Sequence, residues 1–215
     1  MLSMQRLHQL KNISANCIDK IEVRDNGHGI APEDFDALGR RGHTSKISCF
    51  EDLETVGRHS LGFRGEALAS ATILGNVEVT TKRDGDVVAS ALKLNRGGGL
   101  ASQSRCSHPV GTTVNINNLF DKIPVRREQW KKEKESFKQV TKIKELLQSY
   151  ALARVQVRLR LKVLKSPKPS WTFAPRPQDG IKEVVSQLLG RELAAQCICC
   201  LCNLLDIFLP STAGL

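Results

Sequence analysis

The sequence predicts an α+β domain, in which a mixed β-sheet carries helices on one face. Two patterns predict this class. Several short segments alternate polar and apolar residues, as half-buried strands do, whereas residues 127–150 repeat apolar residues at steps of three, four and seven, as an amphipathic helix does. The chain has 215 residues, 40% of them hydrophobic and 25% charged, which is ordinary for a globular domain with its own core.

In the first half of the chain, the expected strands are short and separated by turn residues. The first ends in the tight turn Asp25-Asn26-Gly27, and Asp84-Gly85-Asp86 predicts a hairpin between two later strands. Gly97-Gly98-Gly99 predicts a flexible connection, and the polar residues 33–60 predict a short helix followed by a mobile loop. The strands are expected at residues 20–24, 77–81, 87–94 and 112–118.

In the second half, the helical stripe of residues 127–150 consists of Trp130, Phe137, Val140, Ile143, Leu147 and Tyr150. Residues 154–163 alternate strictly and predict a strand. One face of that strand is apolar, and the other carries Arg154, Arg158, Arg160 and Lys162. A proline-rich loop follows, and then a short helix near 180–190 that ends at Gly190.

The net charge of +10 comes from one segment. Residues 121–170 hold 15 Lys and Arg against 5 Asp and Glu, whereas the rest of the chain holds 17 of each kind. Such a local excess indicates contact with a polyanion, usually nucleic acid, and the basic strand residues Arg154, Arg158, Arg160 and Lys162 are its candidates. The alternative, a well-solvated outer face of the sheet, stays open.

The seven cysteines do not form the pattern of a disulfide framework. Cys17, Cys49 and Cys106 are scattered, and four others crowd into residues 197–202, too close together for a typical zinc site. The first twenty residues contain no apolar core of a signal peptide, and no uncharged apolar stretch has the length of a membrane span. We therefore expect an intracellular protein that does not contact a membrane.

Asp25-Asn26-Gly27-His28-Gly29 is the first segment with chemical potential. A carboxylate at the end of a strand can accept a hydrogen bond from the amino group of adenine, and neighbouring glycines let the backbone approach a purine. By itself, however, an Asn-Gly pair after a strand is more often a hairpin turn.

Two further segments supply the other parts of a nucleotide site. In Ser60 to Leu68 a glycine-bearing loop leads into a helix that begins near Glu66, and the free N–H groups of a helix start bind phosphates. In Gly111-Thr112-Thr113-Val114 a threonine hydroxyl can support Asp25 directly or through water. Taken alone, the first segment is also consistent with an ordinary loop, and an ordinary strand start explains the second better than a nucleotide contact does.

Taken together and in this order, the three segments closely resemble the MutL family of DNA mismatch repair ATPases. The likeness extends to Leu119-Phe120 and Pro124-Val125-Arg126-Arg127, and it covers the chain from about Gln9 to Cys197. The segments Ile21 to Gly27 and His43-Thr44-Ser45-Lys46-Ile47 look most like the eukaryotic Pms-type branch.

The resemblance implies a GHKL (Bergerat-type) fold, a mixed sheet with helices over one face, with ATP held between the helices and a lid. Asp25 would contact adenine, supported by Gly27, Gly29 and either Thr112 or Thr113. Thr44, Ser45 and Lys46 would lie in the lid. The phosphate-binding turn would comprise Leu61, Gly62, Phe63, Arg64, Gly65, Glu66, Ala67 and Leu68.

Family members carry a helix ahead of the strand that ends at Asp25, with a glutamate as general base and an asparagine as Mg²⁺ ligand. Residues 1–18 contain no Asp or Glu, so we expect this chain to supply no catalytic residue and no metal ligand. We expect residues 1–196 to form an incomplete GHKL domain without that helix, and residues 197–215 to be an unrelated Cys-rich hydrophobic tail.

The expected function is that of the ATP-binding domain of a Pms-type mismatch repair protein. In that family ATP binding orders the lid and dimerises the N-terminal domains; the full-length protein would be nuclear, paired with another MutL homologue on mismatched DNA. The alternative is a non-catalytic, truncated isoform that acts as a DNA- or partner-binding module. Gly62-Phe63-Arg64-Gly65-Glu66-Ala67-Leu68 disfavours a different GHKL enzyme, such as a chaperone or histidine kinase.

Overall fold

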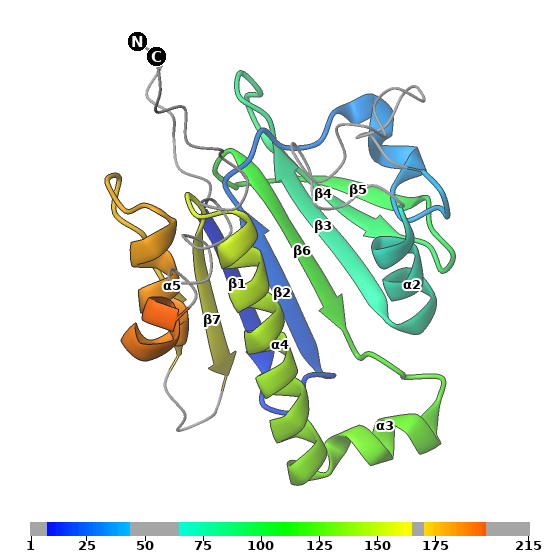
Figure 1. Cartoon of the computed structure of the whole chain (residues 1–215). Coiled ribbons are helices and arrows are strands. Elements are labelled where there is room, and N and C mark those ends of the chain that lie inside the picture. Colours follow the sequence, from blue (N-terminus) through cyan, green and yellow to red (C-terminus); the bar gives the residue numbers. More distant parts are fainter. Residues whose placement is uncertain (1–7, 44–64, 165–169, 197–215) are drawn as a thin grey trace, which may run out of the picture.

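A computed structural model describes residues 8–43, 65–164 and 170–196. In it the strands form one eight-stranded sheet in the order β5-β4-β3-β6-β2-β1-β7-β8 (Figure 1). Neighbouring strands are antiparallel except β1 and β7, which are parallel. The strands are β1 His8–Ser14, β2 Lys20–Asp25, β3 Asn76–Lys82, β4 Ala89–Leu94, β5 Leu100–Cys106, β6 Gly111–Asn117, β7 Arg158–Leu164 and β8 Trp171–Phe173.

Helices cover one face of this sheet, so the predicted α+β class with helices on one face is confirmed (Figure 1). The helix at Pro124–Lys131 has no buried residue and lies beyond the ends of the strands. Leu147 of α4 packs against Ile13 and Leu161, Val184 of α5 against Leu159. The helices are η1 Pro32–Ala37 (a short 3-10 helix), α2 Glu66–Leu74, α3 Pro124–Lys131, α4 Glu133–Ala153 and α5 Ile181–Leu189.

At the other end of the sheet, Phe35 of η1 and Ala71 of α2 cover β3 and β4, where Val79 and Leu92 are fully buried. Valine residues two apart on β3 face this cluster because side chains alternate between the two faces of a strand. The helix-covered face of β3 is therefore the face of Val77, Val79 and Thr81.

Several predicted elements are confirmed. β2 ends at Asp25, β3 and β4 form the hairpin around Asp84-Gly85-Asp86, and α2 begins at Glu66. α5 ends at Leu189 with Gly190 as its C-cap, as the glycine predicts. The mobile loop expected up to residue 60 lies, from residue 44, outside the described residues, and so does the tail at 197–215.

The single helix predicted for 127–150 is wrong, because α3 and α4 are separated by the extended residue Lys132. The break lets Trp130 turn onto the ring of Phe120, 5.4 Å between centroids, while Leu147 packs on the sheet. Phe137, expected in the buried stripe, is 53% exposed.

Two other predictions need correction. The strand expected at 154–163 begins only at Arg158, because Arg154 is the C-cap of α4 and its carbonyl accepts a turn hydrogen bond of 3.0 Å from the N–H of Val157. The Gly97–Gly99 connection, expected to be flexible, is a hydrogen-bonded turn. The N–H of Gly99 donates to the carbonyl of Leu38 at 2.8 Å, which ties the turn to the end of η1.

Candidate functional site

Asp25, the last residue of β2, has its carboxylate held by two backbone groups. The N–H of Gly27 donates to Oδ1 at 2.8 Å, which closes a turn of the kind that aspartate favours. The N–H of Thr112 on β6 donates to the same oxygen at 3.3 Å. Among the described residues Oδ2 has no hydrogen-bond partner, so one carboxylate oxygen is free to accept a ligand's hydrogen bond.

Thr112, rather than Thr113, shares the face of Asp25. Thr112 is the register partner of both Asp25 and Thr81, and directly opposed residues of antiparallel strands project to the same face. The hydroxyl groups of Thr81 and Thr112 lie 3.2 Å apart, and Oγ1 of Thr81 also accepts the N–H of Ile30 at 2.9 Å. These buried threonines connect β3, β6 and the loop after Asp25 on the helix-covered face.

Thr113 faces the other way. It is the register partner of Arg24, and its hydroxyl lies 2.8 Å from Nε2 of His108. Nδ1 of His108 lies 2.7 Å from the carbonyl of Pro109 and must donate to it. The structure thus separates two residues that the sequence left as equal alternatives, and only Thr112 lies beside Asp25.

The glycines around Asp25 let backbones approach each other closely. Gly29 has φ +79°, and a Cβ there would lie 2.4 Å from the carbonyl oxygen of Lys82. Gly111 has φ +127°, and its Cβ would lie 2.3 Å from the carbonyl oxygen of Asp25. The sequence did not single out Gly111 as a contact of Asp25; its place directly before the Thr-Thr pair was the available signal. Side chains at either position would force the Asp25 turn away from β3 and β6.

The start of α2 is built on a third glycine. Gly65 is the N-cap with φ +65°, and a Cβ there would lie 2.2 Å from the carbonyl oxygen of His43. Within the described ranges no side-chain hydrogen bond caps the helix, and the first N–H groups at Glu66, Ala67 and Leu68 are of the kind that binds an anion. Leu68 packs into the cluster around Phe35 and Ala71, which fixes the helix on the sheet.

Glu66 is exposed and pairs with Arg41, Nε to Oε2 3.4 Å. Arg41 follows η1, so the chain that leaves the Asp25 turn returns to the start of α2. The remaining predicted residues of the lid and of the phosphate turn lie outside the described residues; they are Thr44, Ser45, Lys46, Leu61, Gly62, Phe63 and Arg64.

Lys11 of β1 also lies on the helix-covered face, since it is the register partner of Val23 and Leu161. Its ammonium group lies 5.5 Å from the centre of the Tyr150 ring, and burial lowers the pKa of Lys11. The sequence analysis did not single out Lys11. The strand β1 that carries it had no recognisable alternation to reveal which side chains face inward.

The predicted basic strand is divided by the structure. Arg158, Arg160 and Lys162 are exposed on β7, on the face opposite the helices, whereas Arg154 caps α4 and does not belong to that face. Arg24 of β2 joins them, because it is paired in register with Leu10, and Leu10 with Arg160. The sequence signal for Arg24 was its place in the alternating segment 20–25.

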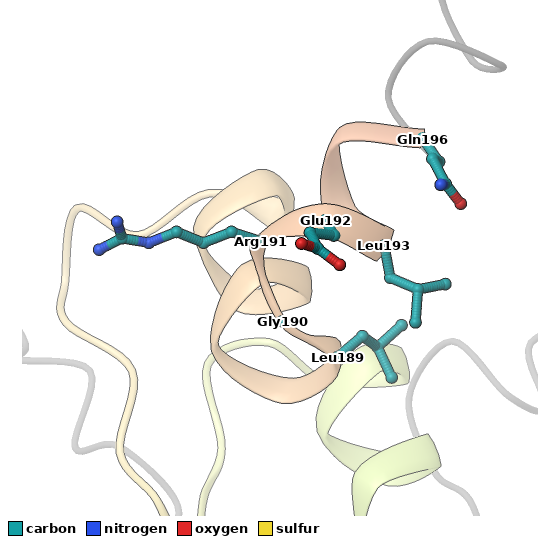
Figure 2. A pocket seen from close by; sticks show the side chains of 6 residues that line it. All are labelled: Leu189, Gly190, Arg191, Glu192, Leu193 and Gln196. Atoms are coloured by element: carbon teal, nitrogen blue, oxygen red, sulfur yellow. The ribbon is translucent and has the colours of Figure 1, made fainter.

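Neither a pocket at the end of α5 nor a metal cluster adds to the site. A pocket of about 290 Å³ lies at Leu189, Gly190, Arg191, Glu192, Leu193 and Gln196 (Figure 2). Its charged side chains Arg191 and Glu192 extend in different directions, so no polar groups converge there. Among the described residues no three His, Cys, Asp or Glu could hold a metal ion, and no helix is long and apolar enough to cross a membrane.

Comparison with known proteins identifies relatives of this chain. A family described as "Histidine kinase-, DNA gyrase B-, and HSP90-like ATPase" matches residues 9–97. Mismatch repair endonuclease pms1 of Dictyostelium discoideum is 39% identical over 139 residues, 65% of this chain. DNA mismatch repair protein MutL of Xanthomonas oryzae is 38% identical over 179 residues, 83% of this chain. The chain belongs to the MutL/Pms family.

Two solved structures share the fold of this chain. The N-terminal domain of a DNA repair protein matches with a TM-score of 0.65 and 25% identity, over 85% of this chain and 51% of that one. The Aquifex aeolicus MutL ATPase domain, solved with ADP, matches with a TM-score of 0.57 and 24% identity, over 85% and 60%. The predicted GHKL fold is confirmed.

The MutL-family chain spans only part of its relatives' length. It covers 13% of the Dictyostelium protein and 27% of the Xanthomonas protein.

Proposed function

We propose that the chain is the ATP-binding domain of a Pms-type DNA mismatch repair protein. The observation that carries the proposal is the carboxylate of Asp25. It is held through Oδ1 by the N–H groups of Gly27 and Thr112 and keeps Oδ2 for a ligand. The exocyclic amino group of adenine is a donor that such an oxygen accepts.

The surrounding residues fit the nucleotide. The absent Cβ atoms of Gly29 and Gly111 keep the Asp25 turn seated against β3 and β6. Thr112 lies beside the carboxylate, where its hydroxyl can support a bridging water. The uncapped start of α2 offers N–H groups and a positive dipole end to the phosphates. We assign no side chain of this chain to Mg²⁺, the ion that accompanies ATP in the MutL family.

The proposal also includes a lid and the rest of the phosphate turn. Thr44, Ser45 and Lys46 belong to a lid that closes over ATP, and Leu61 to Arg64 continue the phosphate turn into Gly65. ATP binding orders the lid and favours association with the corresponding domain of another MutL homologue. The full-length protein acts in the nucleus on mismatched DNA.

A titration with a fluorescent ATP analogue tests the nucleotide site. The 215-residue chain should bind the analogue, and Asp25→Asn should weaken binding at least tenfold, because a hydrogen bond to a charged group contributes about 1.5–3 kcal/mol. Thr113→Val, on the opposite face, is the matched control and should bind like the parent. Equal binding by parent and Asp25→Asn would refute the assignment of Asp25.

The same titration separates the alternative, a module that binds DNA or a partner without using ATP. Under that alternative the parent chain shows no nucleotide binding at millimolar concentration, and its DNA affinity is the same with and without ATP. Nucleotide affinity that depends on Asp25 excludes it.

A further inference from the structure

The face of the sheet opposite the helices carries a cluster of unpaired cations. We call Arg24, Arg158, Arg160 and Lys162 the basic face. All four side chains are exposed, and none forms an ion pair or a side-chain hydrogen bond with another residue in the described ranges. Exposed arginine and lysine side chains without a carboxylate partner keep their full charge for a ligand.

The backbone register fixes the layout of the basic face. Arg158, Arg160 and Lys162 alternate along β7, so consecutive members are about 6.6 Å apart. Arg24 and Arg160 both lie opposite Leu10 of β1, so they share one row two strands apart, about 10 Å. The four charges form a flat array rather than a pocket.

Two carboxylates lie on the same face, Glu22 in the row of Lys162 and Glu78 further along that row. Glu22 pairs with Lys20 at 3.0 Å and accepts a hydrogen bond from Asn12 at 2.6 Å. Although burial opposes it, these two contacts and the nearby charge of Arg24 lower the pKa of Glu22, so this carboxylate stays ionised. Glu78 pairs with Lys93 at 3.6 Å. Glu22 carries one negative charge and interacts with both Lys20 and Arg24, so this group keeps one net positive charge and the rest of the unneutralised charge lies on β7.

We propose that the basic face contacts the phosphate backbone of a nucleic acid. Phosphates repeat along one strand about every 3.4 Å of axis, so an array of cations neutralises several at once. Arginine and lysine side chains spread over a sheet contact phosphates, which carry no sequence information, so we expect the contact to be independent of sequence. An acidic protein fits less well, because protein interfaces have an apolar centre and the basic face has none. That the nucleic acid is duplex DNA rests on the proposed function.

The basic face and the nucleotide site lie back to back on one strand. Arg24 and Asp25 are consecutive on β2, and their side chains project to opposite faces of the sheet, Arg24 beside Thr113 and Asp25 beside Thr112. DNA and nucleotide therefore do not compete for space. The chain is expected to bind both at the same time.

Fluorescence anisotropy with a labelled duplex of mixed sequence, from 50 to 200 mM salt, tests the proposal on the 215-residue chain. Removing two charges with Arg158→Gln/Arg160→Gln should lower the slope of log affinity against log salt by about 1.8, and Arg24→Gln by about 0.9. Arg158→Lys/Arg160→Lys should retain most of the slope. Lys142→Gln/Lys144→Gln, which removes two exposed charges of α4, is the control and should leave the slope unchanged.

Three results would overturn the proposal. Binding by Arg158→Gln/Arg160→Gln equal to that of the parent would do so, and so would an equal loss in the α4 control. The third such result is displacement of the labelled duplex by poly-glutamate as effectively as by unlabelled DNA. Circular dichroism of each variant confirms that the fold is intact. Asp25→Asn, which removes the nucleotide contact, should leave the duplex affinity unchanged, so a failure of the nucleotide proposal is visible separately.

Discussion

The backbone N–H of Thr112 donates to the carboxylate of Asp25 across two paired strands, at 3.3 Å. This contact joins the end of β2 to the start of β6 and holds Oδ1, while Oδ2 has no hydrogen-bond partner among the described residues. The hydroxyl of Thr112 is held beside it by Thr81, 3.2 Å away. The next threonine along the strand, Thr113, has no part in this arrangement.

The two adjacent threonines are therefore expected to differ in mutagenesis. Thr112→Val should weaken binding of a fluorescent ATP analogue about twofold to tenfold, the effect of one neutral hydrogen bond of about 0.5–1.5 kcal/mol. Thr113→Val should leave nucleotide affinity unchanged, although it removes the contact with His108. The same loss in both variants would show that strand stability, and not the hydroxyl beside Asp25, controls the affinity.

Gly29→Ala is expected to destabilise the fold more than the same change at Gly85. Both glycines have φ near +80°, which costs an alanine about 1–2 kcal/mol. At Gly85 a Cβ meets nothing within 4 Å, whereas at Gly29 it meets the carbonyl of Lys82 at 2.4 Å. We expect an additional loss of about 1–3 kcal/mol for Gly29→Ala from this overlap. Urea denaturation of both variants measures the difference, and equal losses would contradict it.

Leu147 and Leu146 on α4 provide a second matched pair. Leu147 is 1% exposed and packs against Ile13 and Leu161, whereas Leu146 is 51% exposed. Leu147→Ala should reduce the free energy of unfolding by about 2–5 kcal/mol, because it leaves a cavity against the sheet. Leu146→Ala should change it by less than about 1 kcal/mol. Thermal denaturation checks both, and a reversed order would place α4 in a different rotation.

The thiol of Cys17 is expected to make the fold sensitive to alkaline pH. Burial raises the pKa of Cys17 from 9.0 to about 11. Between these values the unfolded chain loses the thiol proton and the folded chain keeps it, so the free energy of unfolding falls as pH rises from about 9 to about 11. Below pH 9 the thiol is protonated in both states and contributes no pH dependence.

Urea denaturation at pH 8 and pH 10, with Cys17→Ser as the reference, isolates this contribution. The decrease in stability from pH 8 to pH 10 should be larger for the parent than for Cys17→Ser. The comparison subtracts the other cysteines, which are present in both proteins. An identical decrease would mean that the Cys17 thiol ionises as freely in the folded state as in the unfolded state.

The sequence by itself determined the local elements and the family. The turn after β2, the β3–β4 hairpin, the start of α2 at Glu66 and the end of α5 before Gly190 all follow from short-range patterns. Backbone preferences of glycine, aspartate and alternating apolar residues act over a few residues, so they can be read directly. The order of the three segments around Asp25, Gly65 and Thr112 identified the family.

Only the tertiary structure decided which residues share a face and which distant residues meet. β5 is an edge strand with mostly exposed side chains, so it shows no alternating pattern. β1 pairs with β7, about 150 residues away, and places the polar residue Lys11 on the helix-covered face, so its sequence does not reveal which side faces inward. The break at Lys132, the choice of Thr112 over Thr113 and the exclusion of Arg154 from the basic face depend on register and long-range packing. These are set by contacts between segments far apart in the chain, which local patterns do not encode.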